Sequence, residues 1–275
     1  MNSEGKKVNT KANAKANSEP TAGLAQHQFV ALIPAGGRGE RMGSALAKQY
    51  LPLGGQPMIA WSVQALLSVP WIQHVYVVVA PSDDYWQQDP SLRKLGTQNP
   101  GRLTWYRAGG SSRQQTVANG LEHISRSYAA STWVMVHDAA RPGISRELLE
   151  ALSEAIEAGA DGALLATRVA DTVKRQQPDD ASAGQTPTVA DTIPRDGLWL
   201  AQTPQVFRLG ELVLGLRQAD EDGAVLTDEA SVMERTGTAA RLVTGDWCNV
   251  KVTTPSDLEM MQRVLGHPDA DKNSG

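Results

Sequence analysis

The sequence has a single cysteine, no run of about 20 apolar residues and no excess of positive charge. Cys248 alone excludes an intrachain disulfide framework and fits a reducing compartment, so we expect a cytoplasmic protein. The lysines near the N-terminus are not followed by an apolar segment, so we expect no secretory signal. The formal net charge of −4 gives no general attraction to nucleic acid, and any anion site must therefore be local.

The middle of the chain has the composition of an ordinary globular domain, whereas its two ends do not. Hydrophobic residues make up 41% and charged residues 20% of the 275 residues, which is enough chain for a sizeable core. Residues 1–26 and 267–275 contain almost no large apolar side chains. Such segments cannot bury enough surface to offset the entropy lost on ordering. We therefore predict disordered tails on either side of a domain at residues 27–266.

Short apolar runs alternate with amphipathic segments along most of this domain. The predicted strands are Phe29–Ile33, Val75–Ala80, Leu103–Tyr106, Trp133–Val136, Gly162–Thr167 and Ala240–Val243. The predicted helices are Ile59–Val69, Ser112–Ser127, Arg146–Ala158, Leu209–Gln218, Thr227–Thr236 and a last one that begins near Pro255. Strands that are apolar on both faces are typical of a parallel sheet covered on both sides. The pattern therefore predicts an α/β fold with a mostly parallel sheet.

One segment breaks this alternation. Arg168–Gln176 and Thr188–Ile193 alternate polar and apolar residues on either side of a loop, Gln177–Pro187, that is rich in Pro, Asp, Ser and Gly. The pattern predicts a β-hairpin that has no uniformly apolar face. Because such a ribbon has little to pack on within its own domain, one hypothesis is that it contacts another subunit. The other is a plain surface hairpin.

A glycine-rich loop, Pro34–Gly43, follows the first predicted strand. Its glycines can adopt positive φ and turn backbone N–H groups toward an anion, and Arg38 and Arg41 add charge in a geometry that phosphates accept. Lys48 lies shortly after this loop. The loop has neither the Gly-Lys-Ser/Thr of a Walker A motif nor a strict GxGxxG pattern. A surface turn with solvated cations is the alternative, but the concentration of positive charge favours a phosphate site.

Asp138 comes directly after the predicted strand Trp133–Val136. The carboxyl ends of strands in an open parallel sheet are where ligands bind, and a carboxylate at such a place can hold Mg²⁺. The alternative is that Asp138 caps the following helix. The neighbouring His137 is given no catalytic role, because a single histidine at a strand end is more often structural.

Two further sets of polar residues are ambiguous by themselves. Lys251 lies in the alternating segment Cys248–Thr253, where a lysine can simply discourage strand edges from pairing. Thr172 and Arg195 lie on opposite sides of the predicted hairpin, where they can be ordinary surface residues.

Taken in order, these segments resemble the 2-C-methyl-D-erythritol 4-phosphate cytidylyltransferase family of the non-mevalonate isoprenoid pathway. The resemblance spans about residues 28–266. It rests on the Pro34–Met42 loop, Lys48-Gln49-Tyr50, Gly109-Gly110 with Arg113 and Thr116-Val117, His137–Pro142, Asp171–Lys174, Leu198-Trp199 with Thr203–Gln205, Thr227–Ser231, and Asn249–Thr253. Each motif is weak alone, whereas the ordered set is specific.

The resemblance implies a Rossmann-like nucleotidyltransferase fold and a homodimer in which a β-arm at about residues 168–196 reaches the neighbouring subunit. It implies transfer of CMP from CTP to 2-C-methyl-D-erythritol 4-phosphate, with Mg²⁺ bound mainly by the CTP phosphates and Asp138 as a further possible ligand. Arg41 and Lys48 would stabilise charge on the α-phosphate, and Arg195 and Lys251 would position the sugar phosphate. The other implied substrate-binding residues are Asp138, Arg141 and Thr172 in the sugar-phosphate pocket, with Ala35, Gly36, Gly37, Gly110, Thr116 and Ala139 on the nucleotide side.

Three other functions differ from this one in what they require. A cytidylyltransferase for another polyol phosphate, such as ribitol 5-phosphate, would share the loop and the fold. A catalytically silent nucleotide-binding scaffold would be expected to have lost Arg41, Lys48 or Lys251, and all three are present. An NAD-linked oxidoreductase is disfavoured because the glycine loop is basic and no acidic residue for a ribose hydroxyl ends the strand Val75–Ala80.

Overall fold

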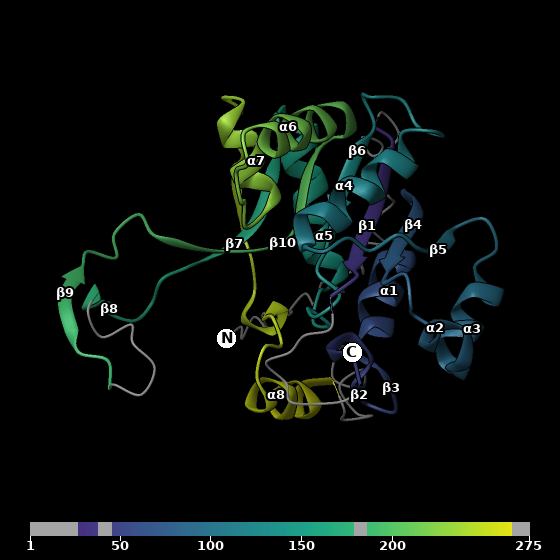
Figure 1. Cartoon of the computed structure of the whole chain (residues 1–275), viewed down its shortest axis with the longest axis horizontal. Helices are drawn as coiled ribbons and strands as arrows, with labels where there is room; N and C mark the ends of the chain where they lie inside the picture. The colour runs from purple at the N-terminus through teal and green to yellow at the C-terminus, as the bar shows by residue number, and fades with distance from the viewer. Residues whose placement is uncertain (1–26, 38–45, 179–185, 266–275) are drawn as a thin grey trace, which may run out of the picture.

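The computed structural model describes residues 27–37, 46–178 and 186–265. Both predicted tails and residues 38–45 of the glycine loop, Arg41 among them, lie outside the described residues. Figure 1 shows one body built around a central sheet, with a hairpin standing away from it. No helix within the described ranges is long and apolar enough to cross a membrane.

The body is organised around a seven-stranded sheet in the order β11-β7-β10-β6-β1-β4-β5. Its strands are β1 (Phe29–Ala35), β4 (Ile72–Val79), β5 (Leu103–Arg107), β6 (Trp133–Val136), β7 (Ala163–Arg168), β10 (Trp199–Arg208) and β11 (Arg241–Thr244). The pairs β1–β4, β1–β6, β4–β5 and β7–β11 are parallel, whereas β10 runs antiparallel to both β6 and β7. The predicted α/β fold with a mostly parallel sheet is confirmed.

Helices cover both faces of this sheet. They are α1 (Met58–Ser68), α2 (Tyr85–Gln88), α3 (Pro90–Gln98), α4 (Arg113–Ile124), α5 (Arg146–Glu157), α6 (Leu209–Glu221), α7 (Glu229–Arg235) and α8 (Pro255–Leu265). Side chains of β1 alternate between two apolar clusters: Phe29 and Ala31 pack with α1 and α5, and Val30 and Leu32 pack with α4, α6 and α7. Burial on both faces explains why the strands are apolar without interruption.

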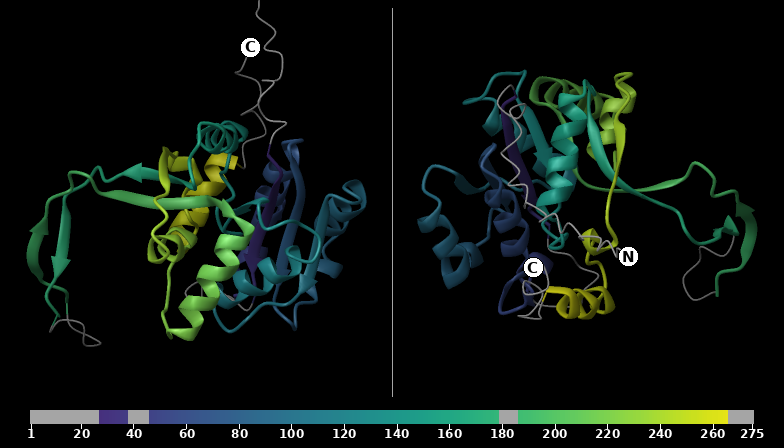
Figure 2. Two further views of the ribbon diagram at one scale, coloured as in Figure 1. Left: turned by 90° about the horizontal axis from the view of Figure 1, so that it is seen from above. Right: turned by 180° about the vertical axis from the view of Figure 1, so that it is seen from behind.

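The predicted hairpin is present and forms the β-arm of the structure. Its strands β8 (Val173–Gln176) and β9 (Val189–Ile193) pair antiparallel, and Arg168 at the end of β7 lies opposite Trp199 at the start of β10. Figure 1 and both views of Figure 2 show the β-arm standing away from the body. Most of its side chains are exposed, so its own subunit gives it little to pack on.

The helices α2 and α3, the strand β10 and several small elements are the parts of the fold that the sequence did not predict. Two short strands, β2 (Pro52–Leu53) and β3 (Gln56–Pro57), and two 3₁₀ turns, Lys48–Tyr50 and Trp247–Asn249, complete the described structure. A proline within an apolar run argues against a central strand, and Pro204 interrupts β10. The structure accommodates it because the register between β10 and β7 shifts between Ala201 and Gln205.

Candidate active site

The candidate site is a pocket at the carboxyl ends of the adjacent parallel strands β1 and β6. Residues 35–37 leave β1 and residues 138–140 leave β6 at the same edge of the sheet. The pocket has a volume of about 270 Å³. It is lined by Pro34, Ala35, Gly36, Gly37, Lys48, Gln49, Arg113, Thr116, Asp138, Ala139, Ala140 and Lys251. Segments that are far apart in the sequence therefore meet where the fold class predicts a ligand.

Lys48 is carried by a short turn that two neighbouring side chains hold in place. The Gln49 amide donates a hydrogen bond of 2.9 Å to the carbonyl oxygen of Ala35 at the end of β1. The Tyr50 hydroxyl, which is almost fully buried, donates one of 2.7 Å to Asp83 in the loop after β4. The base of the Lys48 side chain is thereby fixed relative to two strand ends.

On the side of the pocket that Gly36 and Thr116 line, two glycines, Gly36 and Gly109, allow two backbone segments to meet. A side chain on Gly36 would lie 2.8 Å from the Thr116 hydroxyl and 2.9 Å from the α-carbon of Gly109. The Thr116 hydroxyl accepts a hydrogen bond of 3.0 Å from the Gly110 N–H. Gly110 therefore supports the pocket through Thr116 and is not among its lining residues.

The conformation expected of the loop glycines is wrong at the positions that can be checked. Among the described glycines, those with positive φ do not include Gly36 or Gly37. Close approach of the backbones, not a left-handed turn, is the reason that Gly36 is required. Gly37 is exposed at the mouth of the pocket, where its backbone is open to a ligand.

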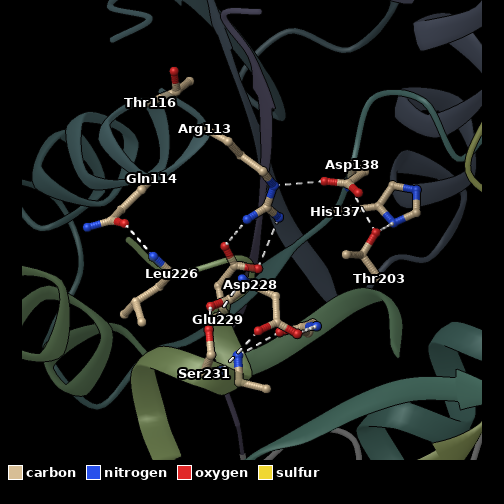
Figure 3. Close-up of polar contacts among 12 residues, drawn as sticks. Arg113, Gln114, Thr116, His137, Asp138, Thr203, Leu226, Asp228, Glu229 and Ser231 are labelled. Carbon is tan, nitrogen blue, oxygen red and sulfur yellow. Dashed lines mark hydrogen bonds and ion pairs between the residues drawn. The ribbon is translucent and has the colours of Figure 1, made fainter. Parts of the chain in front are cut away.

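Asp138 is buried among three cations. One carboxylate oxygen lies 3.0 Å from Nε of Arg113, and the other lies 2.8 Å from Nζ of Lys251 and 3.6 Å from Nε of Arg141. Burial acts to raise the pKa of Asp138, but the attraction of these three cations outweighs it and holds the pKa well below the usual carboxyl range. The resulting cluster is a fixed set of charges at the wall of the pocket, and Figure 3 shows its contact between Arg113 and Asp138.

Arg141 holds the segment that carries Lys251. Its guanidinium donates a hydrogen bond of 2.8 Å to the carbonyl oxygen of Asn249 and one of 3.3 Å to that of Ala201. The Val252 N–H also donates 2.8 Å to the carbonyl oxygen of Ala140. Arg141 is buried and is not among the residues that line the pocket, so the structure places it behind Lys251 and Asp138.

The two predicted site residues on the β-arm lie apart from this pocket in the single chain. Thr172 and Arg195 are exposed, neither lines the pocket, and the Arg195 guanidinium donates to the carbonyl oxygen of Ala170 within the β-arm. Arg41, the remaining predicted catalytic residue, lies outside the described residues.

Two charged residues of this cluster were missed as site residues. Arg113 lines the pocket, and both of its terminal nitrogens donate to the buried carboxylate of Glu229, at 2.7 and 3.1 Å. Arg113 follows the Gly109-Gly110 loop, which is a signal that could have placed it at the site. Glu229 opens a helix, where acidic residues are common for local reasons, and its place in the Thr227–Ser231 motif was the signal that could have found it.

His137 is structural, as expected from its position at the end of a strand. It is completely buried; Nε2 lies 3.1 Å from the carbonyl oxygen of Arg141 and Nδ1 lies 3.1 Å from the Thr203 hydroxyl. A carbonyl only accepts hydrogen bonds, so Nε2 carries the proton of a neutral ring. Burial lowers the pKa of His137 to about 4.

This buried ring predicts a loss of stability in mild acid. Between pH 6.5 and 4 the unfolded chain binds a proton at His137 that the folded chain does not, so the free energy of unfolding falls as the pH falls. The His137 contribution amounts to about 2 kcal/mol between about pH 7.5 and about pH 5. We expect His137→Gln, which keeps a donor for Arg141, to show a shallower pH dependence in urea unfolding. An unchanged difference between the two pH values would contradict this assignment.

The pocket offers one carboxylate to a metal ion. Among the described residues, no group of three or more His, Cys, Asp or Glu side chains is arranged to hold one, and Asp138 is the acidic residue that lines the pocket. Both of its oxygens already face cationic nitrogens. This donor set fits a Mg²⁺ ion that is held mainly by a bound polyphosphate, and it does not form a metal cage of its own.

Comparisons of the sequence and of the fold with known proteins agree on one family. A family model described as 2-C-methyl-D-erythritol 4-phosphate cytidylyltransferase matches residues 29–267. The protein of that name from Laribacter hongkongensis is 46% identical over 244 residues, which cover 88% of this chain and 98% of the relative. The one from Thiobacillus denitrificans is 42% identical over 243 residues, with coverages of 88% and 100%. The crystal structure of the Francisella tularensis protein has a TM-score of 0.70 at 30% identity, and covers 86% of this chain and 100% of that chain.

Proposed function

Since the chain belongs to the 2-C-methyl-D-erythritol 4-phosphate cytidylyltransferase family and transfers CMP from CTP to that sugar phosphate, we propose that the pocket between β1 and β6 is its active site. The observation that carries this proposal is the meeting of Lys48, Arg113 and Lys251 around one pocket at the carboxyl ends of parallel strands. Fixed cations are what a reaction between two phosphates requires.

The chemistry explains why the site contains cations rather than a nucleophile. The substrate phosphate is already an anionic nucleophile at neutral pH. Its oxygen forms a new bond to the α-phosphorus of CTP, while the bond from that phosphorus to the bridging oxygen breaks and pyrophosphate leaves. The barrier comes from repulsion between the two anions and from charge that builds on the α-phosphate oxygens. Lys48, with Arg41 from the glycine loop, stabilises that charge, and Lys251 holds the attacking sugar phosphate.

We propose that Mg²⁺ is the cofactor of this site. The donor set described above fits an ion that would be held mainly by triphosphate oxygens, and Asp138, which lines the pocket, would be its further ligand from the protein. When bound there, Mg²⁺ neutralises part of the phosphate charge. The residues of the chain then orient the two substrates and keep their reacting oxygens and phosphorus in line.

We also propose that the active protein is a homodimer in which the β-arm of each subunit completes the site of the other. The β-arm stands away from its own body and is exposed (Figure 2). Arg195 and Thr172, which the family resemblance assigns to the sugar-phosphate pocket, lie on it.

The single cysteine of the chain fits a cytoplasmic reaction.

The assignment of substrates predicts a selective pattern of pyrophosphate release. We expect release with CTP and 2-C-methyl-D-erythritol 4-phosphate, and much less with ATP or GTP, because the close backbone packing at Gly36 leaves little space for a purine base. Ribitol 5-phosphate with CTP is the control for the sugar. Equal or faster release with ribitol 5-phosphate would overturn the substrate assignment and leave the nucleotidyltransferase class intact.

A further inference from the structure

Behind the wall of the pocket lies a buried carboxylate that accepts two hydrogen bonds from the lining residue Arg113. Glu229 is 2% exposed, and its two oxygens accept hydrogen bonds of 2.7 and 3.1 Å from the two terminal nitrogens of the Arg113 guanidinium. The remaining nitrogen, Nε, donates 3.0 Å to Asp138. Arg113 therefore bridges two carboxylates, as Figure 3 shows.

We propose that Glu229 is a positioning residue for the transfer reaction, which holds Arg113 so that Asp138 and Lys251 keep their places at the pocket wall. This proposal rests on the proposed function of the pocket. Its parts form one chain of contacts: Glu229 fixes Arg113, Arg113 fixes one oxygen of Asp138, and the other oxygen of Asp138 lies 2.8 Å from Nζ of Lys251.

The chain of contacts has a fixed end, because the backbone around Glu229 is held independently of Arg113. The side chain of Gln205 on β10 accepts a hydrogen bond of 2.7 Å from the Ala230 N–H and donates one of 2.9 Å to the Asp228 carboxylate. The Asp228 side chain caps α7 by accepting from the Ser231 N–H. From α4, Gln114 accepts 3.0 Å from the Leu226 N–H. Glu229 is therefore an anchor to which Arg113 adjusts, and not the reverse.

Stability alone is a weak reason to bury this ion pair. Removing two charges from water costs much of what their attraction returns, and apolar side chains of similar size serve a core at least as well. Burial raises the pKa of Glu229 even though Arg113 lowers it, so the carboxylate is held at a cost. Burying the carboxylate is useful where the function depends on the direction of the Arg113 guanidinium.

The direction of Arg113 matters because its side chain, 28% exposed, lies at a pocket that binds polyphosphate. A guanidinium released from Glu229 would turn toward the phosphates and leave one oxygen of Asp138 without its partner. Asp138 would then move relative to Lys251, and a shift of this size at a reacting group lowers the rate steeply. Glu229 therefore keeps Arg113 on Asp138, as a cation of fixed direction at the pocket wall.

The test is Glu229→Gln, which keeps the side-chain size and removes the charge. We expect kcat/KM for the sugar phosphate to fall on the order of 10- to 100-fold, while the Kd of CTP, measured by calorimetry in magnesium buffer, changes little. Arg113→Lys keeps the charge but lacks the planar guanidinium that makes three directed hydrogen bonds to the two carboxylates. It should likewise lower kcat/KM and change the Kd of CTP little. Asp222→Asn is the control, because it breaks only the exposed Asp222–Arg235 pair at the other end of α7, and its kinetics should match those of the wild-type protein.

The pathway through Lys251 is tested by a double substitution. In a Lys251→Ala background, Glu229→Gln should cause no further loss, because the group that it positions is gone. A second loss of full size, or a CTP Kd that rises together with the kinetic defect, would overturn the positioning role in favour of general structural damage. If Glu229→Gln does not fold, Arg113→Lys decides by the same two measurements. Failure of the wild-type protein to use the sugar phosphate would refute the proposed function, whereas variants that match an active wild type would refute only this inference.

Discussion

Replacing Lys48 with alanine should lower kcat by roughly 10²–10³, since loss of one preorganised charge that acts on the transition state costs on the order of 3–4 kcal/mol. Lys48 lines the pocket, and the reaction builds negative charge on the α-phosphate as the new bond forms. A cation fixed in advance needs no reorganisation at that moment. Its removal should therefore affect the rate of the chemical step more than the binding of CTP.

The fold should survive this substitution because other side chains hold the turn. Gln49 and Tyr50 make the buried contacts to Ala35 and Asp83, and neither depends on the Lys48 side chain. Initial rates of pyrophosphate release give kcat and KM, and thermal unfolding shows whether the fold is intact. Lys94→Ala removes an exposed lysine of α3 and is the matched control, with unchanged kinetics. A rise in KM at constant kcat would show that Lys48 only binds substrate.

Most of the sheet and its helices could be predicted because each element carries its pattern locally. Trp133–Val136 was predicted at the bounds that the structure shows, and the hairpin at 168–193 was recognised from alternation around a polar loop. The strand β10 could not be predicted, because Pro204 and its polar neighbours do not show the pattern of a strand. Its position in the sheet is determined by pairing with β6 and β7. Local propensity gives way to tertiary pairing there.

The site was predictable where strand ends carry their ligands in the sequence, as at Asp138. It was not predictable where a role depends on which charges meet in space. Arg141 is predicted to bind substrate, and the sequence did not indicate that its guanidinium would also lie against the carbonyl oxygens of Asn249 and Ala201. Arg113 and Glu229 are far apart in the chain, and the tertiary fold brings the first residue of α4 against the first residue of α7. The sequence alone does not show whether a charged residue at the start of a helix is solvated or buried.

Mixing two inactive chains should restore activity if the site is shared between subunits. The chains are Arg195→Ala, changed on the β-arm, and Lys48→Ala, changed on the body. In a mixed dimer, one site combines both changes, whereas the other combines the intact body of one chain with the intact β-arm of its partner. Random pairing makes half of all dimers mixed, so about a quarter of the sites should be intact. Activity should therefore recover to about a quarter of the wild-type rate.

The sharpest form of this experiment isolates the mixed dimers with two affinity tags, where about half of the wild-type rate is expected. The control pairs Lys48→Ala with Lys251→Ala. Both residues line the same pocket of one chain, so every site in that mixed dimer keeps one defect and no activity should return. If Arg195 served the pocket of its own chain, the first pair would behave like the control. Recovery in one pair and not in the other would therefore show that the β-arm, which has little to pack on in its own subunit, completes the site of its partner.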